Sequence, residues 1–353
     1  KYLWMQIWPY PLCADHSYNQ IPLVHWNDLY AILSLCAYLA LAALVVIRIR
    51  KKELWILGIA IYLIAISLYS NLIITIGTNF GERLAYLPSL GSCITLISGL
   101  TFILNKSLTQ AREFKAAMSS IKLVLPFVLI ISVVAGSYAH IRNNDWKNYF
   151  SIYYDVHKAP DSARLNYWYG LEVMKVKAVD QDDPALKQQY YDTTMVYLNK
   201  AIQIHPDYGD AYASRGLLYY RLGKMNEAEA DYKQAARLKV AQWGMYSNLA
   251  IIYATRMMNE PDSTKRRDLF NEAMKNLNFA LQVDTRPATI YKNMANLYHS
   301  VSMFPEAITK YKEALDHMSA DSEKLIPEIN RCLEECYRLS GDSANAKLYR
   351  SKF

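Results

Sequence analysis

Four apolar stretches between residues 29 and 139 limit the possible folds more than any other feature of the sequence. None contains a charged residue, and they cover 29–47, 54–76, 87–104 and 123–139. About 20 apolar helical residues cross a hydrocarbon core about 30 Å thick. The first two stretches reach that length, and the last two are at the short end of the range. We predict about four membrane spans. The alternative, buried helices of a soluble core, is disfavoured because the stretches have no polar face.

Charged residues are divided unequally along the chain. Residues 1–140 carry 10 Lys and Arg against 5 Asp and Glu, whereas residues 141–353 carry 29 against 27. Nearly all of the net charge of +7 therefore belongs to the apolar half. That placement favours a membrane partner and argues against nucleic acid. We predict two domains, 1–140 and 141–353.

Cations between the stretches predict the orientation of the spans. The links 48–53 and 105–122 each hold four Lys or Arg. Cytoplasmic loops carry such an excess, so both links are expected in the cytoplasm. Residues 1–28, 77–86 and everything after 139 would then lie outside, in a periplasm or a lumen. The only Asn-x-Ser/Thr sequence begins at Asn105 on the predicted cytoplasmic side, which favours a periplasm.

A regular spacing of aromatic and small residues recurs in the second half. One copy has an aromatic residue at position 4, Gly at 8, Tyr at 11, Ala at 20, an aromatic residue at 24 and Ala at 27; these are Tyr212, Gly216, Tyr219, Ala228, Tyr232 and Ala235. The offsets match the tetratricopeptide pattern, and four further copies align with it. The alternative is a set of unrelated amphipathic helices.

The small residues of this pattern let two antiparallel helices approach closely, and the large ones fill the space beside them. One pair cannot bury its face alone, so pairs stack into a superhelix. We therefore predict an all-α fold, with a partial multi-span helical membrane domain followed by about five helix pairs. Extra residues around 180–188 and 259–267 are expected in the turns inside two of the pairs.

Stacked pairs of this kind present their first helices on a concave face. Position 6 holds Asn248 and Asn293 in successive repeats, and each amide can both donate to and accept from a peptide backbone. The alternative is that these two Asn only satisfy neighbouring loops. The other predicted residues of the acceptor-peptide groove are Tyr167, Tyr220, Arg221, Lys292, Asn296 and His299.

The most specific signals lie at the predicted exterior ends of the spans. An aromatic segment with Trp-Pro-Tyr-Pro at 8–11 leads to Asp-His-Ser-Tyr at 15–18. The second exterior loop reads Gly-Glu-Arg-Leu-Ala-Tyr-Leu-Pro-Ser-Leu-Gly at 81–91. Arg-Asn-Asn-Asp-Trp follows the last stretch at 142–146, and the segment 161–170 opens the repeats.

This order of segments resembles the transmembrane and tetratricopeptide repeat-containing proteins and their bacterial relatives. The resemblance covers the whole chain but only the last third or so of a typical membrane domain; its specific part is the E-R-x-x-Y-x-P-S-x-G loop. It implies a GT-C-like fold with exterior repeats. We interpret the chain as the C-terminal part of a longer protein, a bacterial inner-membrane member with periplasmic repeats. An endoplasmic reticulum membrane with lumenal repeats is the alternative.

The resemblance also implies a reaction, in which a sugar passes from a polyprenyl phosphate to a Ser or Thr hydroxyl of an exported protein. The hydroxyl needs a carboxylate base, and the phosphate leaving group needs cationic or hydrogen-bonding partners. In GT-C enzymes the base is expected on the first exterior loop, so we expect it upstream of Lys1 and assign no catalytic residue. No cofactor is assigned, and a need for a divalent metal is left open.

Residues of the two exterior segments are expected to form one wall of the donor site. Arg83 is the only cation of its loop, and a guanidinium suits phosphate oxygens. Glu82 would orient it or contact sugar hydroxyls, and Tyr86 would donate to the phosphate. The alternative is a local Glu82–Arg83 ion pair that fixes the loop. Further donor candidates, for which a simple helix-capping turn is the alternative, are Asp15, His16 and Tyr18.

A non-catalytic membrane-anchored scaffold that gathers periplasmic proteins is the main alternative to an enzyme. An enzyme whose repeats only recruit other enzymes lies between the two. The predicted partners are membrane lipid and a protein or peptide acceptor. No metal site is predicted, because Cys332 and Cys336, four residues apart on one helix face, have no further ligands nearby.

Overall fold

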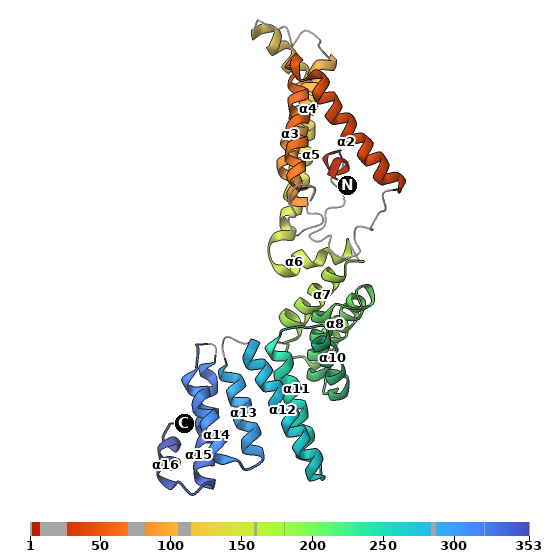
Figure 1. The fold of residues 1–353 in the computed structure, drawn as a ribbon. Helices are drawn as coiled ribbons and strands as arrows, with labels where there is room; N and C mark the ends of the chain where they lie inside the picture. The colour runs from red at the N-terminus through yellow and green to blue at the C-terminus, as the bar shows by residue number, and fades with distance from the viewer. Residues whose placement is uncertain are drawn as a thin grey trace. The chain divides into compact units, whose positions relative to one another are not determined.

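The computed structural model describes residues 2–7, 27–69, 82–104, 114–158, 161–179, 181–283, 287–320 and 322–352. This part of the chain is helical and contains no strand, which confirms the predicted all-α class. It forms two compact units, Lys1–His205 and Pro206–Phe353. The first unit holds the apolar helices and the first helix pair, and the second holds the remaining pairs (Figure 1).

Apolar helices form the first part of the first unit, coloured red to yellow-green in Figure 1. Short helical turns connect them to one another and to the first pair. The helices are α1 (Tyr2–Ile7), α2 (Leu29–Arg48), α3 (Leu54–Tyr69), α4 (Tyr86–Leu104) and α5 (Phe114–Asn143). The connecting elements are η1 (Ile49–Lys51), η2 (Glu82–Ala85), η4 (Asn144–Trp146), α6 (Tyr149–Tyr153) and η5 (Tyr154–His157).

Two stretches of helix in the described residues are long and apolar enough to cross a membrane, Leu29–Lys51 and Leu125–Trp146. The helices α3 and α4 are apolar but shorter over the residues searched. The expectation of about four spans is therefore too high for the described part of the chain. One reason is that the predicted stretch 54–76 continues beyond Tyr69, the last described residue of α3.

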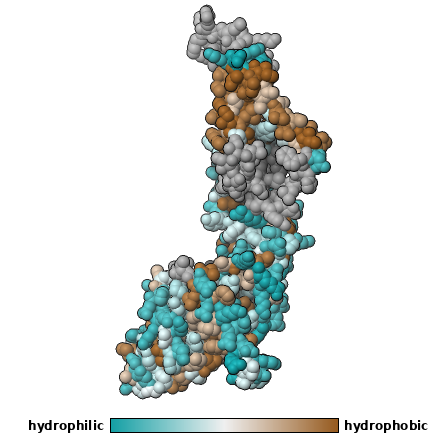
Figure 2. Space-filling view, viewed as in Figure 1, coloured by the Kyte–Doolittle hydropathy of each residue, from teal (hydrophilic) through white to brown (hydrophobic). Residues whose placement is uncertain are grey.

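The apolar side chains of these helices are largely uncovered by protein. No residue of α2 is buried, and Leu39 and Val46 are 60% and 75% exposed. Where Figure 2 colours this group of helices, the surface is mostly hydrophobic, whereas the surface over the helix pairs is mixed and mostly polar. Apolar surface of this extent is unfavourable in water and favourable in hydrocarbon. The exposure of these apolar side chains therefore supports a membrane environment for α2 and α5.

Two glycines let α3 and α4 touch backbone to backbone. A Cβ atom placed on Gly91 would lie 2.5 Å from the backbone nitrogen of Tyr62, and one on Gly58 would lie 2.6 Å from that of Thr95. Small residues at such a crossing are typical of helix pairs in membranes. The Tyr62 hydroxyl also lies 3.1 Å from that of Tyr38 and connects α3 to α2.

A cluster of ion pairs, which we call the joint, connects the end of α5 to η5. Arg142 Nη2 lies 2.8 Å from Asp155 Oδ2, and Arg142 Nη1 lies 2.6 Å from Asp145 Oδ2. Lys158 Nζ contacts both carboxylates, at 2.8 Å and 2.9 Å. The side chains of Asp155 and Arg142 are only 2% and 10% exposed. A desolvated pair of this kind is stable only while both partners are present, so the joint fixes η5 to the end of α5.

Five pairs of antiparallel helices follow, as the repeat offsets predict. The first helix of the first pair continues into a stretch of π-helix. The helix α8 begins at Pro184, and the Asp183 side chain caps its N-terminus. The pairs are α7 (Ala163–Glu172) with η6 (Val173–Ala178) and α8 (Pro184–Ile204), α9 (Gly209–Arg221) with α10 (Met225–Arg237), α11 (Trp243–Asn259) with α12 (Ser263–Val283), α13 (Ala288–Ser300) with α14 (Phe304–Asp316), and α15 (Ile326–Leu339) with α16 (Ser343–Arg350). The turn η7 (Glu323–Leu325) precedes α15.

The pattern positions form the core of these pairs. Ala228 and Ala235 of α10 and the aromatic residue between them, Tyr232, are completely buried. A Cβ atom on Gly216 would lie 2.8 Å from the Tyr232 ring, so only glycine fits at position 8 of this pair without displacing that ring. Equivalent positions of the other pairs are also buried, among them Ala250, Ala273, Ala280, Ala295, Ala307, Tyr311 and Ala314.

The extra residues of the third pair lengthen its helices, so the expectation of an expanded turn in that pair is wrong. The helix α11 has 17 residues and α12 has 21, whereas α9 and α10 have 13 each. The turn between α11 and α12 is short, because α11 ends at Asn259 and α12 begins at Ser263. The additions are close to whole turns of 3.6 residues, so the buried faces stay aligned. In the first pair, residues 184–188 belong to the 21-residue α8, whereas residues 181–183 precede it.

Gly91→Leu tests the close contact of α3 and α4. The new side chain must displace the backbone of α3, and overpacking of this kind costs about 2 kcal/mol or more. We expect a clear loss of thermal stability of the detergent-purified protein. Gly136→Leu is the matched control, because no atom lies within 4 Å of a Cβ on Gly136. Equal stability of the two variants would contradict the contact.

Candidate functional site

Three of the six predicted donor-site residues lie around the start of α4. Glu82 and Arg83 belong to η2, directly before α4, but their side chains lie outside the described part of the structure. Tyr86 is the first residue of α4 and is 84% exposed, so its hydroxyl is free of the protein core. Three other candidates, Asp15, His16 and Tyr18, lie outside the described residues.

The N-terminal helix α1 lies against η2, so the structure brings two of the predicted exterior segments together. Trp4 of α1 is 61% exposed, as expected for a residue that lies in an interfacial aromatic belt. The sequence places the two segments more than seventy residues apart. The donor-site residues themselves remain a prediction.

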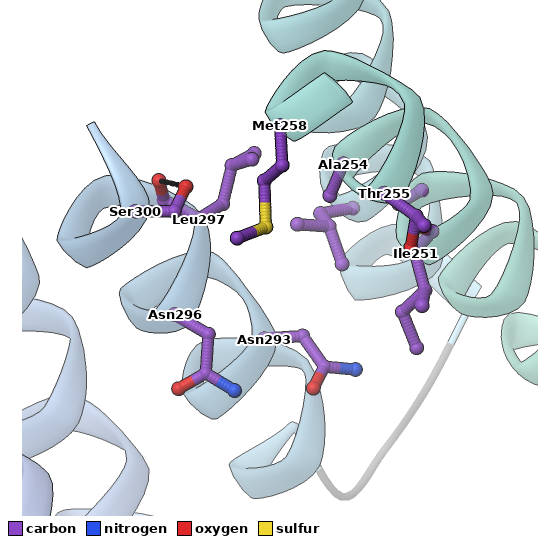
Figure 3. Close-up of a pocket in the computed structure, with 10 residues that line it drawn as sticks. Ile251, Ala254, Thr255, Met258, Asn293, Asn296, Leu297 and Ser300 are labelled. Atoms are coloured by element: carbon purple, nitrogen blue, oxygen red, sulfur yellow. Dashed lines mark hydrogen bonds between the residues drawn. The ribbon is translucent and has the colours of Figure 1, made fainter.

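A pocket of about 250 Å³ lies between the first helices of the third and fourth pairs. Its residues come from α11 and α13, with Leu277 of α12 behind them. Figure 3 shows the Met258 side chain extending between Leu297 and Ala254, while the amides of Asn293 and Asn296 project from α13. The remaining lining residues are Ala250, Ile251, Thr255 and Ser300.

The pocket combines an apolar wall with polar groups along one edge. Such a surface suits an extended peptide, because side chains can occupy the apolar part while amides and hydroxyls bind the backbone. Met258 is 72% exposed, and an unbranched thioether adapts its shape to different ligands. The position of the pocket between two first helices agrees with the groove that the repeat pattern predicts.

The predicted Asn pair already has partners within the protein. Asn248 Nδ2 donates to the Tyr232 hydroxyl over 3.0 Å, and Asn293 Nδ2 donates to Ser247 Oγ over 2.8 Å. Asn248 satisfies a buried tyrosine and does not line the pocket. Asn293 does line it, and one hydrogen bond leaves that amide a second N–H and a carbonyl oxygen. The structure therefore separates the two Asn: the first has a structural contact, and the second faces the pocket.

The other predicted groove residues are dispersed over several pairs. Asn296 lines the pocket and accepts a hydrogen bond from the Tyr311 hydroxyl over 2.6 Å. Lys292 Nζ lies 2.9 Å from both carboxylate oxygens of Glu328. The rest do not line the pocket: Tyr167 is buried beside Trp168, Tyr220 is half-buried, Arg221 is exposed at the end of α9, and the His299 ring lies against Phe304.

Several lining residues were not among the predicted ones. Met258 and Ala254 lie toward the end of the lengthened α11, where the groove positions of a regular repeat run out. The sequence does contain a signal for these positions, which is the excess of residues between Tyr253 and Ala273. Assigning that excess to the helices instead of the turn would have predicted a longer α11.

The paired cysteines of α15 show no reactive character. Burial raises the pKa of the Cys336 thiol to about 12, and burial likewise raises the pKa of Cys332. Both thiols are therefore protonated at neutral pH, whereas a nucleophile or metal ligand needs the thiolate. Among the described residues no group of His, Cys, Asp and Glu side chains is arranged to hold a metal ion.

Fold and site define a protein with apolar, membrane-compatible helices followed by a tetratricopeptide superhelix. No model of a known protein family matches the chain. Protein O-mannosyl-transferase Tmtc3 of Drosophila melanogaster is 25% identical over 245 residues, 67% of this chain and 24% of the relative. Mouse TMTC3 is 23% identical over 269 residues (70% and 26%), and human TMTC4 is 24% identical over 171 residues (46% and 22%).

The chain is thus homologous to the transmembrane and tetratricopeptide repeat-containing O-mannosyl-transferases, which confirms the resemblance. It spans about a quarter of the length of these relatives. They are animal proteins, so membership of a bacterial branch remains a prediction. Among solved structures, the repeat protein TTC0263 of Thermus thermophilus aligns at 19% identity (54% of this chain, 89% of that chain, TM-score 0.40) and YrrB at 11% (58%, 90%, 0.43).

Asn248→Ala tests the structural role of this residue. The substitution leaves the buried Tyr232 hydroxyl without its amide donor, which costs about 1–3 kcal/mol of the free energy of unfolding. Asn293→Ala removes a bond to a single serine hydroxyl at the pocket edge and is expected to cost less. Urea unfolding of the repeats, followed by far-UV circular dichroism, measures both. A smaller loss for Asn248→Ala than for Asn293→Ala would contradict this assignment.

Proposed function

We propose that this chain is part of a membrane glycosyltransferase that transfers a sugar from a polyprenyl phosphate to a Ser or Thr hydroxyl of an exported protein. Homology with proteins named O-mannosyl-transferases is the observation that carries the proposal, and it makes mannose the first sugar to test. The order of the chain, membrane-compatible helices and then repeats, agrees with an enzyme that holds a lipid-linked donor beside a protein acceptor.

In this proposal the η2–α4 segment binds the donor phosphate. The reaction breaks the bond between the sugar and the phosphate oxygen and forms a bond to the acceptor oxygen, whose proton passes to a carboxylate base. Negative charge grows on the departing phosphate, so a guanidinium at that position stabilises the transition state. Arg83 supplies this charge, Glu82 orients it, and the exposed Tyr86 hydroxyl donates a hydrogen bond.

The repeats have the role of holding the acceptor. Their polar surface and the pocket between α11 and α13 suit an unfolded segment, since an extended chain offers backbone groups to Asn293 and Asn296 and side chains to the apolar wall. Acceptor and donor must be on the same side of the membrane. The cations of links 48–53 and 105–122 support an exterior side for both, in a periplasm or in a lumen.

Arg83→Ala in the full-length protein tests the donor site. Loss of one charge-stabilising group from such a site costs about 10²-fold in rate. We expect transfer from polyprenyl-phosphate mannose, measured as glycopeptide by mass spectrometry, to fall by that order at unchanged protein abundance. Arg50→Ala, which removes a cation from the predicted opposite side, is the control and retains activity. Normal transfer by the Arg83 variant would count against this site.

Binding of an acceptor peptide tests the groove separately. Met258→Glu and Asn293→Ala should each weaken the affinity for an unfolded Ser/Thr-containing segment of an exported protein by about 3- to 10-fold, since one apolar contact or hydrogen bond is lost. Fluorescence polarisation of the labelled peptide measures this. Asn278→Ala, an exposed residue of α12 outside the pocket, is the matched control. Unchanged affinity would remove the pocket as the acceptor site while leaving the donor site untouched.

A further inference from the structure

We propose that α6, the residues on either side of it and Lys177 of η6 form a second membrane contact, which binds phospholipid headgroups at the end of α5. We call this surface the interface patch and define it as Trp146, Lys147, Tyr149, Tyr154 and Lys177. The proposal goes beyond glycosyl transfer and requires only that α5 crosses a bilayer. It would hold equally if the chain were a scaffold.

Exposure of large aromatic side chains is the first observation. Trp146, Tyr149 and Tyr154 are 57%, 68% and 52% exposed. Neighbouring aromatic residues of the same segment are used in packing: the Phe150 ring lies 5.5 Å from that of Tyr169, and the Tyr153 ring lies 5.5 Å from that of Trp168. Phe150 and Tyr153 therefore pack on α7, and the Tyr154 ring also lies 6.1 Å from that of Tyr169. More than half of the surface of Trp146, Tyr149 and Tyr154 nevertheless stays exposed in the described part of the protein.

Trp and Tyr are the residues that concentrate at membrane–water interfaces, because their rings prefer the headgroup layer while their polar atoms stay hydrated. The spanning stretch Leu125–Trp146 ends within this patch. The uncharged part of this stretch ends at residue 139. At 1.5 Å per helical residue, the patch therefore begins about 10 Å beyond the last uncharged residue, on the headgroup side of the hydrocarbon core.

The joint prevents the patch from moving away from that level. The segment from Trp146 to Tyr154 lies between two residues that are paired with each other, Arg142 and Asp155. Because this pair is buried, the segment that contains α6 is held at the end of α5. Figure 1 shows α6 turning away from the α5 axis. A flexible linker without this ion pair would not hold α6 at the end of α5.

Charge identifies the partner as phospholipid. In the joint, Arg142 and Lys158 neutralise the two acids of the region, Asp145 and Asp155. Lys147 and Lys177 are exposed. The Lys177 ammonium lies 5.4 Å from the centre of the Phe150 ring, which places the end of η6 beside α6. Each lysine near an anionic membrane surface contributes about 1 kcal/mol of attraction, and the lipid phosphates supply the opposite charge.

Photocrosslinking of the full chain in nanodiscs tests the proposal. The probe is benzoylphenylalanine in place of Tyr149, in discs of phosphatidylcholine and phosphatidylglycerol at a ratio of about 4:1, a composition chosen to give an anionic surface. The control carries it in place of Trp243, which is 39% exposed at the start of α11 in the second unit. We expect lipid adducts, detected by mass spectrometry of peptides, at residue 149 and few at residue 243.

No lipid adduct at residue 149, or equal yields at both positions, would overturn the proposal. A second measurement keeps the test decisive if a probe variant fails to fold. In discs with brominated acyl chains, Trp146→Phe should remove a quenched component of the tryptophan emission, whereas Trp243→Phe should remove an unquenched one. Removal of an unquenched component by both substitutions would also overturn it. Neither experiment depends on sugar transfer, so its outcome is distinct from that of the donor-site test.

Discussion

The buried ion pair between Arg142 and Asp155 lies between helices that are stable in hydrocarbon and helices that are stable in water. On one side of it, α2 and α5 expose apolar side chains that are stable in hydrocarbon. On the other side, the helix pairs expose mostly polar side chains that require water. A charged pair with 10% and 2% exposure is costly to desolvate and is lost if either partner is removed. The attachment of the first helix pair to α5 therefore depends on a contact that is specific to these residues.

The repeat half of the fold could be predicted from the sequence, because its stability rests on local spacing. Ala228, Tyr232 and Ala235 recur at fixed intervals, and close packing of two helices needs small and large residues at those intervals. The same counting placed the extra residues near Asn259 in a turn. Offsets measure how many residues are inserted, but they do not say whether whole helical turns are added, and whole turns keep the buried faces in register.

The candidate site was less accessible to sequence reasoning. The pattern placed Asn248 and Asn293 in one groove, yet Asn248 contacts a tyrosine sixteen residues earlier, a contact that exists only after adjacent pairs stack. Met258 joined the pocket because α11 is longer than a regular repeat helix. On the membrane side, the proximity of α1 to η2 follows from the folding of segments that are distant in sequence. A residue type and its position can suggest chemistry, whereas its neighbours come only from the three-dimensional arrangement.

The backbone contact at Gly58 and Gly91 has a consequence for how a long-chain carrier would approach the membrane helices. With main-chain atoms already touching at Gly58 and Gly91, this crossing of α3 and α4 has no room for an isoprenoid tail. If the proposed donor carries such a tail, the tail must pass these helices elsewhere. This directs a search for the entry route to the boundaries of α2 and α5, where apolar side chains are uncovered and can part without breaking a backbone contact.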